Sequence, residues 1–126
     1  MVLLDKTKSR ARAAELISQL ESYESGAKYY TALLDGGLLP PAKADTAAYR
    51  VKYYTETAAA IRIALSLLTD TEKEVVTLLF CSGMSILDVC DSVALERSSV
   101  YAYRASALDK VARYMRAHGE RGHGSK

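Results

Sequence analysis

The chain has 126 residues and a formal net charge of +2, and it contains no apolar run of about 18 residues that could span a membrane. The opening Met1-Val2-Leu3-Leu4 is too short for a signal peptide, so we expect a cytoplasmic protein of one domain, or a small module with an extension. Cys81 and Cys90 fall on apolar positions of helical patterns, which predicts reduced, buried thiols. Neither has a His or Cys at metal-ligand spacing, so no metal or other cofactor is predicted.

Two long helical patterns occupy the first half of the sequence. The first runs from about Asp5 to Leu34 with little to break it, and its apolar residues follow steps of four and three: Leu16, Leu20, Tyr23, Ala27, Tyr30 and Leu34. Gly-Gly and Pro-Pro pairs end this pattern, and Asp45 or Thr46 is expected to cap a second helix. The apolar residues of the second helix form a similar stripe, or seam: Val51, Tyr54, Ala58, Ile61, Leu65 and Leu68. Because each stripe needs a cover, residues 1–68 are predicted to form an antiparallel, coiled-coil-like hairpin, a candidate for homo-oligomerisation or partner docking.

Three shorter helical patterns follow. Thr69-Asp70-Thr71-Glu72 is a capping box, and it begins a helix that Gly83 closes. Ser85 caps the next helix, whose inward residues are Ile86, Val89, Cys90 and Val93. After a turn at Ala94-Leu95-Glu96, a last helix from about Arg97 to Val111 should bury Val100, Tyr103, Ala107, Leu108 and Val111. The fold class predicted is therefore all-α: a long hairpin, a three-helix helix-turn-helix domain over residues 69–116, and a disordered tail over 117–126.

Charge is unevenly distributed along the chain. The last helix and its end are basic, whereas the segment from Asp70 to Glu96 carries six acidic residues against Lys73. A basic helix on an acidic scaffold favours a nucleic-acid contact on that helix more than the small net charge suggests. A second basic run opens the chain, at Lys6, Lys8, Arg10 and Arg12. A solvated helix face is the simpler interpretation of that run, and contact with phosphate is the alternative.

The segment LTDTEKEVVTLLFCSGMSILDVCDSVALERSSVYAYRASALDKV resembles the fourth region of bacterial primary-type sigma factors, which binds the promoter −35 element. It also resembles the related phage late-transcription regulators of the ArpU and RinA type. The matching positions are Glu72, Gly83, Ser85, Asp88, Ser99-Val100 and the ending Ala107-Leu108-x-Lys110. The sequence departs from the pattern at Ala94, where the turn commonly has Gly, and at Glu96, where Ser usually caps the helix.

The resemblance implies a sequence-specific DNA-binding transcription regulator of phage or prophage type, with the helix over about 97–111 in the major groove of double-stranded DNA. The candidate DNA-binding residues are Arg97, Ser98, Ser99, Tyr101, Ala102, Arg104 and Lys110. Arg97 suits guanine, whereas Arg104 and Lys110 suit the phosphate backbone. One alternative is a protein-interaction module that contacts RNA polymerase or another regulator, and another is a phage packaging adaptor of the small-terminase kind. An enzyme is not predicted, because no carboxylate pair, Ser/His set or phosphate loop stands on rigid structure.

Overall fold

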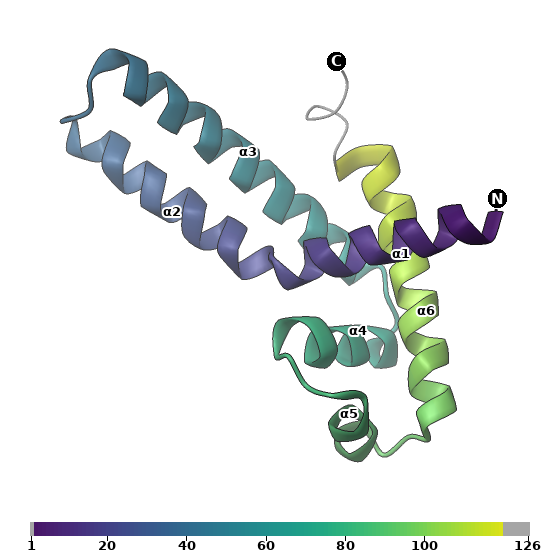
Figure 1. Cartoon of the computed structure of the whole chain (residues 1–126). Helices are drawn as coiled ribbons and strands as arrows, with labels where there is room; N and C mark the ends of the chain where they lie inside the picture. The colour runs from purple at the N-terminus through teal and green to yellow at the C-terminus, as the bar shows by residue number, and fades with distance from the viewer. Residues whose placement is uncertain (1, 120–126) are drawn as a thin grey trace.

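The computed structural model describes residues 2–119, and these residues form helices joined by short connections, with no strand among them (Figure 1). This confirms the all-α class. The helices are α1 Val2–Ser18, α2 Leu20–Gly36, α3 Pro41–Ser66, α4 Asp70–Val76, α5 Ile86–Val93 and α6 Arg97–Tyr114. Two π-helical segments, η1 Thr77–Cys81 and η2 Met115–Gly119, extend α4 and α6. The predicted disordered tail begins inside η2, and its residues 120–126 lie outside the described range.

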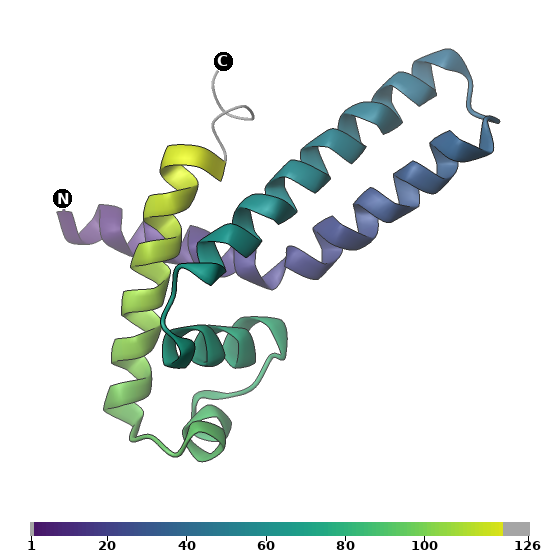
Figure 2. The ribbon, with the colours of Figure 1, turned by 180° about the vertical axis from the view of Figure 1, so that it is seen from behind.

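The first long helical pattern is not one helix, and the prediction of a continuous helix from about residue 5 to 34 is wrong at Gln19. Gln19 has φ −98° and ψ 3°, and the chain bends there between α1 and α2 (Figures 1 and 2). The Ser18 hydroxyl donates to the Glu15 carbonyl at 2.7 Å, in competition with the N–H of Gln19. Such a side-chain bond within a helix favours bending. The bend allows α1 to cross α6 while α2 pairs with α3.

Helices α2 and α3 lie antiparallel and side by side, and a short connection joins them (Figure 1). Gly37 ends α2 in the left-handed region, with φ 69°. Helix α3 begins at Pro41 and not at the expected caps Asp45 or Thr46. Proline is well suited to the first helical position because it has no N–H to leave unpaired. The Thr46 hydroxyl instead donates to the Ala42 carbonyl within the helix.

The α2–α3 pair is tightly packed only at its base. Leu20 is the single buried residue of α2, whereas the second half of α3 buries Ile61 and Leu65 among others. Farther out the seam is filled by the rings of Tyr23, Tyr30 and Tyr54, and Tyr53 lies at its edge against Tyr23 and Tyr54; the centroids of the contacting rings are 5.7–6.2 Å apart. Gly26 admits the Tyr54 ring, because a β-carbon at Gly26 would lie 2.8 Å from it.

The main group of buried side chains joins the base of this pair to the C-terminal helices. Its members come from α1, α2, α3, α4, α6, η2 and the connection after α3: Ala13, Leu16, Ile17, Leu20, Ala58, Ala60, Ile61, Ala64, Leu65, Leu68, Val76, Ala107, Leu108, Val111 and Met115. They lie on both sides of residue 68, where the sequence suggests a domain boundary. Helix α1 therefore contributes to the packing of α6 as well as to the start of α2.

A second, smaller cluster holds α4, α5 and α6 together. Val75, Val89 and Val100 are fully buried at its centre, one from each helix. The expectation of two buried thiols is wrong for Cys81, which is exposed, while Cys90 is half-buried against this cluster, and both are free. Cys81 is the last residue of the π-helical segment Thr77–Cys81, and its thiol donates to the Ile17 carbonyl of α1 at 3.7 Å.

Candidate nucleic-acid interface

Helices α5 and α6 are joined by the three residues Ala94 to Glu96, and local capping sets their ends. The Ser85 hydroxyl accepts the N–H of Asp88 at 3.1 Å, which confirms Ser85 as the cap of α5. Ala94 ends α5 with φ 57° and ψ 47°, the left-handed conformation that the turn requires and that glycine adopts at less cost. Glu96 occupies the N-cap position of α6 without a capping bond from its side chain. The sequence therefore supplies the turn with two residues that are poorly suited to it.

The first turns of α6 present several of the candidate residues to solvent. Arg97, Ser98, Tyr101 and Ala102 are exposed, and Ser99 is half-buried beside the fully buried Val100. Among the described residues, no ion pair joins Glu96 to Arg97. An arginine and two hydroxyl-bearing side chains thus lie exposed within five residues of the helix start. These are groups that can donate to base edges or to phosphates.

Tyr103 is not part of the buried stripe. The sequence pattern places it inward with Val100, but 36% of its surface is exposed. Tyr103 follows Val100 by three residues, so it lies near the same face of the helix. The partner helices α4 and α5 are short, however, and cover only a narrow part of α6. Tyr103 therefore adds a second exposed ring to the first half of α6.

Arg104 is held against Tyr101 one turn away. Its guanidinium carbon lies 4.8 Å from the centre of the Tyr101 ring, which is a cation–π contact. Sequence spacing alone could have predicted this pair, because residues three apart are neighbours on a helix. The contact keeps the charge near the surface and limits the range of orientations of the guanidinium.

Lys110 has a different environment from Arg104. Its Nζ donates to Oε1 of Glu72 at 2.9 Å, and the Ser106 hydroxyl donates to Oε2 of the same carboxylate at 2.5 Å. The backbone N–H of Thr69 completes the set at 2.9 Å, and the predicted capping box of α4 is present. Burial alone would raise the pKa of the Glu72 carboxyl, but the hydrogen bonds from Ser106, Lys110 and Thr69 lower that pKa to about 2. Lys110 is thereby drawn into a structural contact between α6 and α4.

The basic run at the start of the chain is also partly engaged. Arg10 binds Asp109 of α6 through two hydrogen bonds, at 2.8 and 2.9 Å, and Lys6 lies 3.9 Å from the same carboxylate. The hydrogen bonds from Arg10 lower the pKa of Asp109. This contact cannot be predicted from the sequence, because 99 residues separate the partners and no local pattern links them. The contact fastens α1 to α6.

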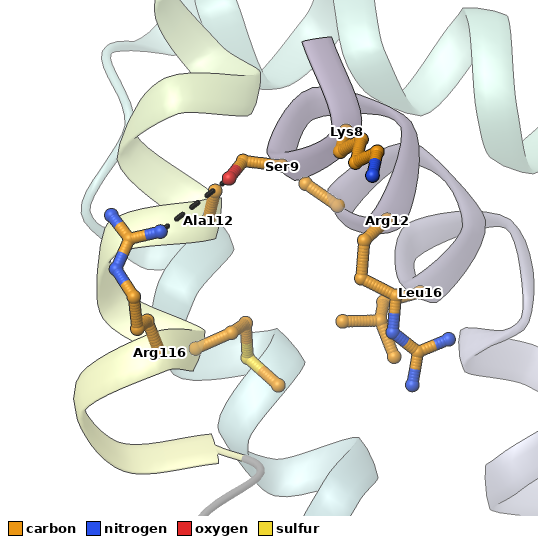
Figure 3. Close-up of a pocket in the computed structure, with 8 residues that line it drawn as sticks. Lys8, Ser9, Arg12, Leu16, Ala112 and Arg116 are labelled. Carbon is orange, nitrogen blue, oxygen red and sulfur yellow. Dashed lines mark hydrogen bonds between the residues drawn. The ribbon is translucent and has the colours of Figure 1, made fainter. Parts of the chain in front are cut away.

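A pocket of about 270 Å³ opens between α1 and the end of α6 (Figure 3). Lys8, Arg12 and Arg116 surround it, and Arg116 donates weakly to the Ser9 hydroxyl at 3.5 Å. Arg12 also pairs with Glu15 at 3.1 Å. The pocket lies at the end of α6 opposite Arg97, where Ala112 lines it, and the 18 residues of this helix span about 27 Å. It is therefore separate from the surface formed by the first turns of α6.

Comparisons with known proteins add no relative to this description: no family model matches the chain, and neither curated proteins nor solved structures give a match. Among residues 2–119, no helix has the length and hydrophobicity needed to cross a bilayer. Within the same range, no group of three His, Cys, Asp or Glu side chains is placed to hold a metal ion.

Proposed function

We propose that this protein is a sequence-specific DNA-binding transcription regulator of phage or prophage type. In this proposal α5, the turn and α6 act as a helix-turn-helix, and the first turns of α6 enter the major groove of double-stranded DNA. The observation that carries it is the exposed set of Arg97, Ser98 and Tyr101 at the start of a helix whose other face is packed on α4 and α5. The resemblance to the fourth region of sigma factors supports the same arrangement.

Each candidate residue from Arg97 to Arg104 has a role that fits its position. Arg97 can bond O6 and N7 of guanine, and Ser98 and Tyr101 can contact a base edge or a phosphate. Ala102 can lie against a thymine methyl group. Ser99 is half-buried, and its hydroxyl can still donate to a phosphate of the DNA backbone. Arg104 then binds a phosphate of the DNA backbone, since its contact with the Tyr101 ring limits the orientation of the guanidinium.

The second candidate is a protein-interaction module that docks on RNA polymerase or another regulator. It is favoured by the surface of α5, where Leu87 is 60% exposed and the neighbouring Ile86 is half-buried. Asp88 and Asp91 of the same helix are exposed. These carboxylates, together with Glu96, would repel phosphate if DNA approached over α5. They suit a basic protein surface instead. A packaging adaptor of the small-terminase kind would use the same elements in a ring-sized assembly.

Selection of binding sites from a random pool of duplex DNA tests the proposal. The wild type should enrich one motif, and Arg97→Ala should relax preference at one base pair, by about 1–3 kcal/mol of discrimination. Glu96→Ala, selected in parallel, shows whether the neighbouring carboxylate reads a base itself. Arg113→Ala is the matched control, because this exposed arginine lies in the last turn of α6, away from the proposed groove contact. If the wild type enriches no motif even at low salt, the protein-interaction module becomes the better proposal.

A further inference from the structure

The outer part of the α2–α3 pair projects from the rest of the molecule, and we name it the arm (residues 21–56; Figures 1 and 2). In the arm, only Ala47 is buried. Two helices can cover each other along one line only, so both broad sides of the arm stay open. A two-helix arm of this length buries little apolar surface by itself, which makes further cover favourable.

The arm has two different faces. The bidentate contact of Arg62 with Glu24, at 2.5 and 2.9 Å, marks one side. Because each residue turns a helix by about 100°, Tyr53, nine residues before Arg62, points to the opposite side of α3. Tyr49 lies one turn earlier and is stacked on Tyr53 at 6.5 Å with the rings 4° from parallel. On α2, Tyr29 follows Glu24 by five residues and is turned by about 140° toward that same opposite side.

We name this side the tyrosine face, formed by Tyr29, Tyr49 and Tyr53. Tyr29 and Tyr49 are 59% and 62% exposed, which is unusual for two large rings on one surface. The same helical period places most charged residues of the arm and its base on the other face: Glu24, Lys28, Asp35, Lys52 and Arg62. Glu56 approaches the rim of the tyrosine face. Arg50, three residues before Tyr53, lies on the same side of α3, where its guanidinium donates to the Tyr30 hydroxyl at 2.6 Å and lies over the Tyr30 ring. A surface rich in aromatic rings and poor in charge has the composition of a protein–protein interface core.

We propose that the tyrosine face binds the tyrosine face of a second copy of this chain, so that two arms form a four-helix interface. The charges near this surface are one cation, Arg50, which is bonded to Tyr30, and one anion, Glu56, at the rim. Such a surface can meet its own copy without net repulsion, whereas a strongly charged partner would find little to recognise. The arm is about 24 Å long and two helices, or about 20 Å, wide. Two such faces cover about 1,000 Å² in projection, and more along the corrugated surface, close to the 1,200 Å² or more of stable specific interfaces.

The dimer would relate its two copies by a two-fold axis, as most soluble dimers do. Its arms lie apart from the first turns of α6 (Figure 1). Both α6 helices would then remain available, which under the proposed function means an inverted repeat in the DNA. The interface itself does not depend on DNA binding, and its test uses none, so the two proposals can fail separately.

Sedimentation analysis of the full chain without DNA tests the interface. The wild type should have twice the chain mass of 13.8 kDa at high protein concentration. Tyr49→Glu should sediment as a monomer with unchanged helix content, since a ring that is 62% exposed contributes little to the fold of one copy. The matched control is Ala48→Glu, which adds the same charge at the adjacent exposed position on the charged face and should stay dimeric.

Tyr29→Glu is a second test variant, because it changes the same face from the side of α2. Loss of the dimer in both tyrosine variants, with the dimer kept in Ala48→Glu, supports the proposal. A monomeric wild type, a dimer that survives Tyr49→Glu, or an equal loss in Ala48→Glu overturns it. An assembly larger than two would also overturn it and would favour the packaging adaptor.

Discussion

Lys110 and Glu72 join the candidate DNA-reading helix to the first turn of the helix that supports it, with Nζ 2.9 Å from Oε1. Glu72 is 4% exposed, yet its carboxylate is fully bonded, to Lys110, Ser106 and the N–H of Thr69. One buried carboxylate therefore caps α4 and fixes α6 upon it. The part of α6 from Ser106 to Lys110 is thus held on α4 by this contact as well as by apolar packing.

This contact predicts a loss of stability in acid. The pKa of Glu72 is about 2 in the folded chain and about 4.5 as the ordinary value, so its contribution is fully present above pH 4.5 and is lost as pH falls toward 2. The shift corresponds to about 3 kcal/mol at most. Urea unfolding at pH 7 and pH 3 should show a smaller acid loss in Glu72→Gln than in the wild type. Glu74→Gln, an exposed neighbour in α4, should keep the wild-type loss, and equal losses in all three would contradict the prediction.

Gly26 offers a test of the packing between α2 and α3. Alanine normally stabilises a helix interior by about 1 kcal/mol over glycine. At Gly26, however, a β-carbon would meet the Tyr54 ring at 2.8 Å, and the rings of Tyr23 and Tyr30 hold that ring in place. We expect Gly26→Ala to lower the stability by about 1 kcal/mol, since overpacking costs about 1–3 kcal/mol. In Gly36→Ala, where the space is open, thermal unfolding should occur at the same or a higher temperature.

The local features of the fold could be read from the sequence, because their causes lie within a few residues. The capping box at Thr69, the cap at Ser85 and the stop at Gly83 all appear in the structure. The bend at Gln19 could not be predicted from the heptad pattern, which continues through it. It depends on α1 finding a separate partner in α6, and the Arg10–Asp109 contact that secures α1 spans 99 residues.

The candidate site was predictable to the same extent. Exposure of Arg97, Ser98 and Tyr101 follows from the helical period once Val100 faces inward. The engagement of Lys110 did not follow, because Glu72 is 38 residues away and its burial depends on how α4 meets α6. Thus the sequence predicted which side chains of the first turn face outward, but it placed Tyr103 inward although that ring is exposed, and it could not tell a free cation from a paired one.

Replacing Ala94 by glycine should make the folded protein more stable. Its φ of 57° costs a non-glycine residue about 1–2 kcal/mol, part of which glycine would lose again through its greater freedom in the unfolded chain. We expect Ala94→Gly to stabilise the protein by about 0.5–1 kcal/mol in thermal or urea unfolding. Ala102→Gly is the matched control, since the same change in the exposed interior of α6 should destabilise by about 1 kcal/mol. Destabilisation by Ala94→Gly would mean that the turn does not need its left-handed residue.

Substitutions of Arg104 and Lys110 should differ in their effect on the salt dependence of DNA binding. Both are basic residues of α6, but Arg104 is stacked on Tyr101 at the surface, whereas Lys110 is bonded to Glu72. If Arg104 meets a phosphate, Arg104→Ala weakens binding to all DNA sequences alike. It also reduces the slope of log affinity against log salt by about 0.9. Lys110→Met should leave that slope unchanged and lower the unfolding temperature instead, because it leaves a buried carboxylate with one donor fewer.

Fluorescence anisotropy with one duplex over a series of salt concentrations, alongside thermal unfolding of each variant, measures both effects. Arg113→Ala, in the exposed last turn of α6, controls for loss of one positive charge far from the proposed groove contact, and its slope should stay that of the wild type. A slope reduced in Lys110→Met but not in Arg104→Ala would exchange the two roles. The lysine would then leave Glu72 to bind phosphate, and the DNA would lie nearer the middle of α6 than its first turns.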